Sequence, residues 1–285
     1  MSDFQRPRFD FQAGPFRFCL GPQTKIMGVL NVTPDSFSDG GRYFAPALAE
    51  KQALRLQDEG AHFLDIGGES SRPGSRPVPA REEIRRVVPV LKRLRKKIKI
   101  PVSVDTAKSE VAHAALDEGA VIINDISALA DKRMAQLIAR YGASVVLMHM
   151  QGSPQDMQKK PRYRAVLKEV KAHLRRSVQK ALDAGIERTK IAVDPGFGFG
   201  KTTEHNFELL SGLEELSSLG LPTLVGLSRK SFIGRILGAP VEERLVGSLA
   251  AASVAIQRGA HILRVHDVAA HRQLAMLVDH AMSVG

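Results

Sequence analysis

Eight short apolar stretches recur along the chain, and nearly every one ends in polar, charged or glycine residues. The stretches are 26–30, 62–66, 100–104, 121–123, 143–148, 190–193, 222–227 and 261–263. Eight strand–helix repeats are typical of a (β/α)8 barrel, in which the carboxyl ends of the strands meet at one rim that carries function. The repeat therefore predicts an α/β fold, a (β/α)8 TIM barrel, together with the place of its functional residues.

Helix-like segments fill most of the gaps between these stretches. They cover roughly 46–59, 80–98, 107–118, 132–141, 162–184, 203–218, 241–258 and 268–282, and five of them close at Gly60, Gly119, Gly142, Gly185 and Gly259. Glycine is the usual residue just after a helix because it adopts a left-handed conformation without steric cost. The main alternative, an open doubly wound sheet, usually carries Gly-x-Gly-x-x-Gly after its first strand. That motif does not follow residue 30, which favours the barrel.

The length of 285 residues suits one barrel without a second domain. We expect residues 24–285 to form the catalytic domain. Residues 1–23, rich in Phe, Arg and Pro, have no clear periodicity and are expected to be an extension that caps one end of the barrel.

Several classes of protein are disfavoured by composition. No apolar run is long enough to span a bilayer, and the N-terminus is not followed by the apolar segment of a secretory signal. The single cysteine, Cys19, excludes an intramolecular disulfide and suits a reducing compartment. We therefore expect a cytoplasmic protein.

The net charge of +11 raises the question of nucleic-acid binding. The densest basic run, 92–99, falls in a region whose apolar residues recur at helical spacing. That spacing places the basic side chains on the solvent face of an amphipathic helix. No DNA- or RNA-binding signature accompanies them, so no nucleic-acid partner is expected. A basic protein can also attract small anions.

Two loops after the first and second strands carry candidate binding groups. The first, 31–41, begins with Asn31, whose neutral amide oxygen suits Mg²⁺ that keeps most of its waters and a ligand phosphate. It also contains Phe37, which we expect to be exposed. The second, 67–74, combines hydroxyls, an arginine and glycines, which suit a phosphate or carboxylate. An ordinary surface loop and a Gly/Pro turn are the alternatives.

Asp105, Asn124 and Asp194 end the third, fourth and sixth strands. A carboxylate can accept two hydrogen bonds from an amide N–H beside an exocyclic amine, as in guanine or a pterin. Helix capping is the alternative, and it is a serious one for Asp105. Three such groups at one rim favour a site for a planar heterocycle.

The segment from Asp194 to Lys201 alternates three glycines with Phe197 and Phe199. Glycines let a backbone turn sharply and approach a ligand, and phenylalanines offer a flat apolar surface. A glycine-rich connection between a strand and a helix is the alternative.

The last two strands end in cations. Ser228-Arg229-Lys230-Ser231 follows the seventh strand and is expected to open a short helix, where cations and N–H groups together can bind an anion. Arg264 and His266 are two apart on the eighth strand, so they point to the same side. Two inward cations need an anionic partner, and a diphosphate would satisfy both.

These motifs, in order, resemble those of the dihydropteroate synthase family of folate biosynthesis. The resemblance covers about residues 24–280 and includes Asn31–Gly41, Gly67–Gly74, Ser103–Thr106, Ile123–Asp125, Met148–Gly152, Asp194–Lys201, Ser228–Lys230 and Arg264–His266. It implies a pterin-binding transferase that joins 4-aminobenzoate to 6-hydroxymethyl-7,8-dihydropterin diphosphate and releases 7,8-dihydropteroate and diphosphate. It also implies Mg²⁺ as the cofactor, competition by sulfonamides, and a homodimer.

The resemblance also implies roles for individual residues. Asn31 would bind Mg²⁺, and Asp105, Asn124, Asp194 and Lys230 would hold the pterin, with Met148 lining the same pocket. Ser71, Arg264 and His266 would meet the diphosphate, while Phe37, Pro73, Phe199 and Ser231 would border the aminobenzoate. Arg72 and Val265 complete the expected substrate-binding set, in which Asp105, Lys230, Arg264 and His266 are the catalytic members. The family commonly has Thr where this chain has Ser71, so the hydroxyl is kept and a methyl group is absent.

We hypothesise an SN1-like substitution at the pterin methylene, with the departing diphosphate stabilised by Mg²⁺, Arg264 and His266. Buried Asp105 would stabilise the cation that forms on the pterin. Three alternatives stay open: a methyltetrahydrofolate methyltransferase acting on a corrinoid, a Schiff-base aldolase that uses Lys230, and a non-catalytic pterin- or nucleic-acid-binding protein. His149, after the fifth strand, has no assigned role.

Overall fold

The computed structural model describes residues 4–33, 45–71 and 74–284. Within them, eight parallel strands stand in the order β8-β7-β6-β5-β4-β3-β10-β9. A single bridge between Val193 and Thr223 joins the two outer strands, which closes the sheet into a barrel. The strands are β3 (Lys25–Asn31), β4 (Phe63–Gly67), β5 (Val102–Asp105), β6 (Ile122–Asp125), β7 (Ser144–Met148), β8 (Ile191–Asp194), β9 (Leu224–Val225) and β10 (Ile262–Val265). The predicted TIM barrel is confirmed.

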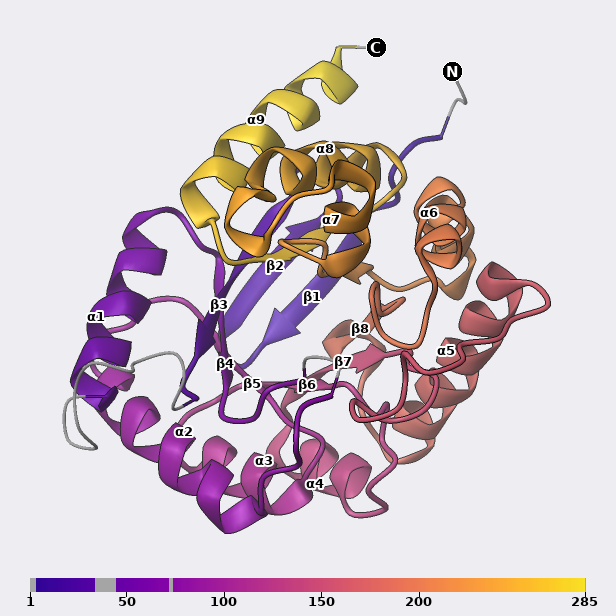
Figure 1. Ribbon diagram of the computed structural model, residues 1–285. Coiled ribbons are helices and arrows are strands. Elements are labelled where there is room, and N and C mark those ends of the chain that lie inside the picture. Colours follow the sequence, from indigo (N-terminus) through magenta and orange to yellow (C-terminus); the bar gives the residue numbers. More distant parts are fainter. Residues whose placement is uncertain (1–3, 34–44, 72–73, 285) are drawn as a thin grey trace.

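Helices surround the strands (Figure 1). They are α1 (Ala45–Asp58), α2 (Ala80–Leu94), α3 (Ser109–Asp117), α4 (Met134–Tyr141), α5 (Val166–Asp183), α6 (Thr203–Ser211), α7 (Ser231–Leu237), α8 (Leu245–Gln257) and α9 (Val268–Ser283), with 3-10 turns η2 (Arg188–Lys190), η3 (Leu213–Leu219) and η4 (Val241–Glu243). The glycines expected to close five helices all have positive φ, between 60° at Gly142 and 98° at Gly119. The predicted helix over 203–218 was wrong in one respect, because Gly212 separates α6 from η3.

The basic run lies where the helical pattern placed it. Lys92 and Arg93 in α2 are exposed, whereas Leu91 and Leu94 are buried. Arg93 and Lys97 both pair with Glu50, on α1. None of the helices in the described part of the chain has the length and apolar character that crossing a bilayer requires.

The N-terminal extension forms an antiparallel hairpin of β1 (Phe9–Ala13) and β2 (Phe16–Leu20), whose strands cross the middle of the ring of helices in Figure 1. These two strands were not predicted, although the alternation of apolar and polar residues in Phe9-Asp10-Phe11-Gln12-Ala13 has the period of a strand. The hairpin packs into the end of the barrel at which the strands begin. An apolar plug forms there from Phe11, Ala13 and Leu20 of the hairpin and Met27, Phe63, Ile122, Val146, Ala192, Leu224 and Ile262 of the barrel.

Because side chains alternate along each strand, a layer of polar groups lies next to this plug, on the side toward the carboxyl ends of the strands. Residues two apart on a strand point to the same side, so the next inward residue stands one layer closer to the strand ends. This layer contains Asp65 after Phe63, Asn124 after Ile122, Met148 after Val146, Asp194 after Ala192 and Arg264 after Ile262. The end of the barrel at which the strands finish, which we call the barrel mouth, is therefore polar above an apolar floor.

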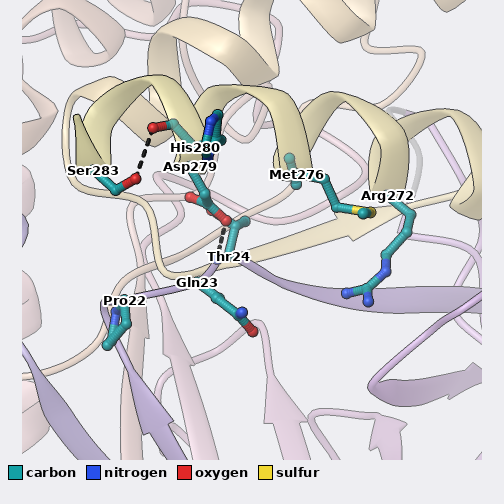
Figure 2. A pocket seen from close by; sticks show the side chains of 9 residues that line it. Pro22, Gln23, Thr24, Arg272, Met276, Asp279, His280 and Ser283 are labelled. Carbon is teal, nitrogen blue, oxygen red and sulfur yellow. Dashed lines mark hydrogen bonds between the residues drawn. The ribbon is translucent and has the colours of Figure 1, made fainter. Parts of the chain in front are cut away.

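The extension is tied to the barrel by a buried ion pair. Arg6 donates to Asp279 Oδ1 of α9 at 2.7 Å, to Thr24 Oγ1 at 2.7 Å and to the Ala260 carbonyl oxygen at 2.9 Å. The same carboxylate accepts from the Thr24 backbone N–H at 2.6 Å. Figure 2 shows Asp279 and Thr24 in a cavity of about 400 Å³ between α9 and the start of β3. This cavity lies at the hairpin end of the barrel, so it is separate from the mouth.

Replacing Arg6 by alanine is expected to lower the free energy of unfolding by about 2 kcal/mol, because Asp279 loses its charge partner but keeps Thr24. Urea unfolding followed by circular dichroism measures the change. Arg8→Ala is the control, since Arg8 is exposed. Equal stability of the two variants would contradict a stabilising role for the ion pair between Arg6 and Asp279.

Candidate active site at the barrel mouth

Four polar side chains from four strands form one network at the centre of the mouth. Arg264 donates through Nε to Asp65 Oδ2 at 2.6 Å and through Nη2 to Asp105 Oδ2 at 2.8 Å. Asn124 Nδ2 donates to the same Asp65 oxygen at 3.1 Å. Asp65 was not among the predicted site residues. Its signal in the sequence was a lone acid within the apolar run Phe63-Leu64-Asp65-Ile66.

Burial shapes the protonation of this network. It raises the pKa of the Asp105 carboxyl, an effect that Arg264 opposes and Asp65 reinforces. The carboxylates in turn raise the pKa of Arg264, which stays charged. Burial together with the neighbouring Arg264 lowers the pKa of His266 to about 4, so its ring is neutral at pH 7.

The expectation that Arg264 and His266 are two cations in need of a diphosphate as their anionic partner is therefore corrected. Arg264 already has two carboxylates, and neutral His266 makes a 3.1 Å hydrogen bond between Nδ1 and Ser228 Oγ. Neither residue needs an added anion for its own stability. They remain beside each other at the end of β10, on the side of the strand that faces the mouth.

Asp194 ends β8, and Lys230 follows β9, the strand that pairs with β10. Burial raises the pKa of Asp194, and its Oδ1 accepts a hydrogen bond from the Gly196 N–H at 2.7 Å. Lys230 Nζ lies 4.2 Å from the centre of the Phe199 ring, a cation–π contact. Burial and then Arg264 lower the pKa of Lys230 to about 8, against the opposing effect of Asp194 and Asp105.

The glycines after Asp194 allow the backbone of this loop to pack closely against the loop that follows β7. At Gly196, with φ +70°, a β-carbon would overlap the carbonyl oxygen of His149, and at Gly200 it would overlap that of Gln151. Gly198 stands against the Lys230 stem. Of the two phenylalanines, Phe197 is part of the main core, whereas Phe199 packs with Met148 and Met157. Of these two rings, Phe199 is therefore the one that offers a flat surface at the site.

His149 has a clear partner. The buried Lys201 ammonium lies 3.0 Å from His149 Nδ1, 2.9 Å from the Gly196 carbonyl oxygen and 3.0 Å from that of Phe199. Burial lowers the pKa of His149 to about 2, so its ring is a neutral acceptor, and lowers that of Lys201 to about 7. One side chain thus holds the loop that carries Asp194 and Phe199 against the end of β7.

The second loop is fixed at its base. Glu69 accepts from the Val78 N–H at 2.9 Å and pairs with Lys108, which also donates to Glu83 at 2.6 Å. Arg86 donates to the Gly68 carbonyl oxygen at 2.9 Å. Ser71 follows this base and is half-buried.

Asn31 ends β3 beside Gly67 of β4. Its Oδ1 and the Asp105 side chain lie within 4 Å of the position that a β-carbon on Gly67 would occupy. No cluster of three or more His, Cys, Asp or Glu side chains suited to a metal occurs in the described segments. Mg²⁺ commonly keeps several waters and is held by one or two protein oxygens plus substrate phosphates. Asn31 fits an ion brought by a phosphorylated substrate.

The structure brings together Asn31, Asp105, Asn124, Met148, Asp194, Phe199, Lys230, Arg264 and His266 at one end of the barrel. Ser231 is the exposed first residue of α7, directly after Lys230. Val265 is buried in the core between the strands and the helices, on the opposite face of β10 from Arg264, so its side chain is not brought to the mouth. Phe37, Arg72 and Pro73 lie outside the described residues.

The barrel and the acceptor-rich mouth define an enzyme that binds a nitrogen heterocycle, and a family comparison agrees. The model of the pterin-binding enzyme family matches residues 27–266, so the chain belongs to that family. Dihydropteroate synthase of Haemophilus influenzae is 46% identical over 246 residues, which are 86% of this chain and 90% of that protein. Within the family, the chain takes its place among the dihydropteroate synthases.

Solved structures give the same result. Xanthomonas albilineans dihydropteroate synthase with 4-aminobenzoic acid has a TM-score of 0.92 and 44% identity, covering 98% of this chain and 100% of that one. Yersinia pestis dihydropteroate synthase in a sulfonamide drug complex has a TM-score of 0.91 and 41% identity, covering 96% and 100%.

Proposed function

We propose that this transferase condenses 6-hydroxymethyl-7,8-dihydropterin diphosphate with 4-aminobenzoate to give 7,8-dihydropteroate and diphosphate. The observation that carries the proposal is the meeting of Asp105, Asn124 and Asp194 with Lys230 and Arg264 in one mouth. The first three offer acceptors for the N–H edge of a pterin, Lys230 helps to hold the same ring, and Arg264 offers positive charge for the departing anion.

The geometry suggests how this chain's residues share the work. Asp194, fixed through Oδ1 by Gly196, presents its other oxygen to the ring. Asp105 and Asn124 meet the ring from neighbouring strands, while Met148 and Phe199 supply apolar contact. Arg264 and neutral His266, which can donate a hydrogen bond through Nε2, meet the diphosphate together with Ser71.

The reaction is an SN1-like substitution at the pterin methylene. The C–O bond to diphosphate breaks, its electron pair leaves with the oxygen, and the ring carries the positive charge beside buried Asp105. The arylamine then forms the C–N bond and releases one proton to solvent. Asn31 would hold Mg²⁺, which would neutralise charge on the diphosphate. Phe37, Pro73, Phe199 and Ser231 are proposed to border 4-aminobenzoate, for whose place sulfonamides compete.

Diphosphate release tests this proposal. We expect release from the pterin diphosphate to require both 4-aminobenzoate and Mg²⁺, and to match the 7,8-dihydropteroate formed one to one. A sulfonamide should raise the KM for 4-aminobenzoate without changing the maximal rate. Methyl transfer to a corrinoid, or borohydride trapping of a substrate on Lys230, would point instead to one of the alternative enzymes.

The lowered pKa of Lys230 predicts an alkaline limit. The free enzyme loses this cation as the pH rises through about 8, so kcat/KM for the pterin diphosphate should fall above that pH. Arginine stays charged at every accessible pH, so Lys230→Arg should lack the alkaline limb, whatever its absolute rate. Initial rates between pH 6 and 10 measure both profiles. If kcat/KM of the variant falls at the same pH, the alkaline decrease must come from the titration of another group.

We also infer a cytoplasmic homodimer. Exposed apolar residues gather on three helices that lie together in Figure 1, α7, α8 and α9: Ile236, Leu237, Val246, Val254, Met276 and Leu277. An apolar surface of this kind favours association. The small residues of α8 face inward, because Ala251, Ala252 and Ala255 are buried. Val246→Glu with Leu277→Glu should give a monomer by light scattering, whereas an unchanged mass would place the interface elsewhere.

A further inference from the structure

Asp65 lies in the same inward layer as Asn124 and Asp194, which are proposed to touch the pterin. It lies one layer above Phe63 of the apolar plug, and its side chain is 0% exposed. A carboxylate buried so deeply is stable only where donors meet it. Its Oδ2 has two, Arg264 Nε at 2.6 Å and Asn124 Nδ2 at 3.1 Å.

These contacts determine how the Asn124 amide is turned. A guanidinium has only donors, so it requires an acceptor at the position of Asp65 Oδ2. A carboxylate has only acceptors, so Asn124 must turn its Nδ2 toward Asp65. Its Oδ1 then points away, and this buried atom has no hydrogen-bond partner within the described part of the chain. A buried carbonyl oxygen left in this state is unfavourable until a donor arrives.

Among the acceptors around the ring position, Asn124 therefore has an orientation that the protein fixes before the ligand binds. Asp105 and Asp194 are acceptors by their chemistry when ionised. Asn124 is an acceptor only because Asp65 and Arg264 hold its amide one way round. A flipped amide would present N–H to the N–H edge of the ring and repel it.

We propose that Asp65 is a positioning residue for pterin recognition, which acts by fixing the Asn124 amide so that Oδ1 faces the ring. The proposal rests on the proposed function, because the ring is taken to be a pterin. It assigns no contact between Asp65 and the substrate.

Two substitutions separate orientation from charge. Asp65→Asn keeps an acceptor, because Arg264 forces the new amide oxygen into the place of Oδ2, and Asn124 should keep its orientation. Asp65→Leu keeps the branched shape of the side chain and removes the acceptor. We expect the Kd of 6-hydroxymethyl-7,8-dihydropterin, which has no leaving group, to rise about tenfold or more in the leucine variant and less than threefold in the asparagine variant. Titration calorimetry measures both.

A double-mutant cycle identifies the residue through which Asp65 acts. In an Asn124→Ala background there is no amide to orient, so Asp65→Leu should weaken ring binding by less than threefold. A merely structural role for Asp65 would give the same loss in both backgrounds. The control is Asp125→Asn, since Asp125 is also buried at the end of β6 but bonds to Ser127 and Leu129 of its own loop. Its Kd for the ring should match that of the wild type. If Asp65→Leu is not recovered folded, Asp65→Ser, too short to reach Asn124, has the same expected result.

Equal weakening by Asp65→Asn and Asp65→Leu, or an undiminished effect in the Asn124→Ala background, overturns the proposal. Ring binding with the expected pattern but no condensation with 4-aminobenzoate supports the role of Asp65 and overturns the proposed reaction. A wild-type protein that does not bind the dihydropterin overturns both.

Discussion

Replacing Asp194 by asparagine is expected to lower kcat/KM for the pterin diphosphate about 100-fold, or about 3 kcal/mol. The Gly196 N–H needs an acceptor at the place of Oδ1, 2.7 Å away, so the new amide must put its oxygen there. Its NH₂ group then faces the substrate, where the carboxylate had offered an acceptor to ring N–H groups. One charge-assisted hydrogen bond is lost and a contact between two donors takes its place.

Initial rates at varied pterin diphosphate measure this effect, with the loss expected chiefly in the KM for the pterin. Asp125→Asn is the matched control, because it removes another buried carboxylate from the end of a strand without touching the proposed ring position. Unchanged pterin affinity in Asp194→Asn would remove Asp194 from the site. The same loss in both variants would show that the effect comes from stability.

The strand ends were the predictable part of this molecule. A parallel strand is visible in the sequence as an apolar run, and the strand ends where the run ends. Asp105, Asn124 and Asp194 could therefore be placed at one rim from the sequence alone. The period of two also put Arg264 and His266 on one side of β10. By the same rule Val265 belongs on the other side, and its assignment to the substrate pocket rested on its place within a motif.

The partners of these residues could not be predicted from the sequence. Asp65 and Arg264 are 199 positions apart, and only the pairing of β10 with β3 places β4 and β10 on either side of β3. Without knowledge of that pairing, Arg264 was interpreted as a cation that needs an anionic ligand. The lowered pKa of His266 could not be predicted either, because it depends on burial and on the neighbouring Arg264. The role of His149 likewise depends on Lys201, which reaches it from the loop after β8.

Substituting alanine for Gly196 is expected to have the largest effect on stability of any change at the mouth, about 4 kcal/mol in the free energy of unfolding. A left-handed φ of +70° costs an L-residue roughly 1–2 kcal/mol. The added methyl group would also overlap the His149 carbonyl oxygen, and relieving such overpacking costs about 1–3 kcal/mol. Relief must come from movement of the loop, which pulls the Gly196 N–H away from Asp194 and lowers pterin affinity as well.

Gly238→Ala separates these two causes. Gly238 has φ +63°, close to that of Gly196, and no atom lies within 4 Å of the place where its β-carbon would be. It should therefore show the backbone cost alone, about 1 kcal/mol, with normal pterin binding. Urea unfolding and pterin titration of both variants make the comparison. Equal destabilisation would mean that the loop after β8 yields freely, and that close packing against His149 does not hold Asp194 in place.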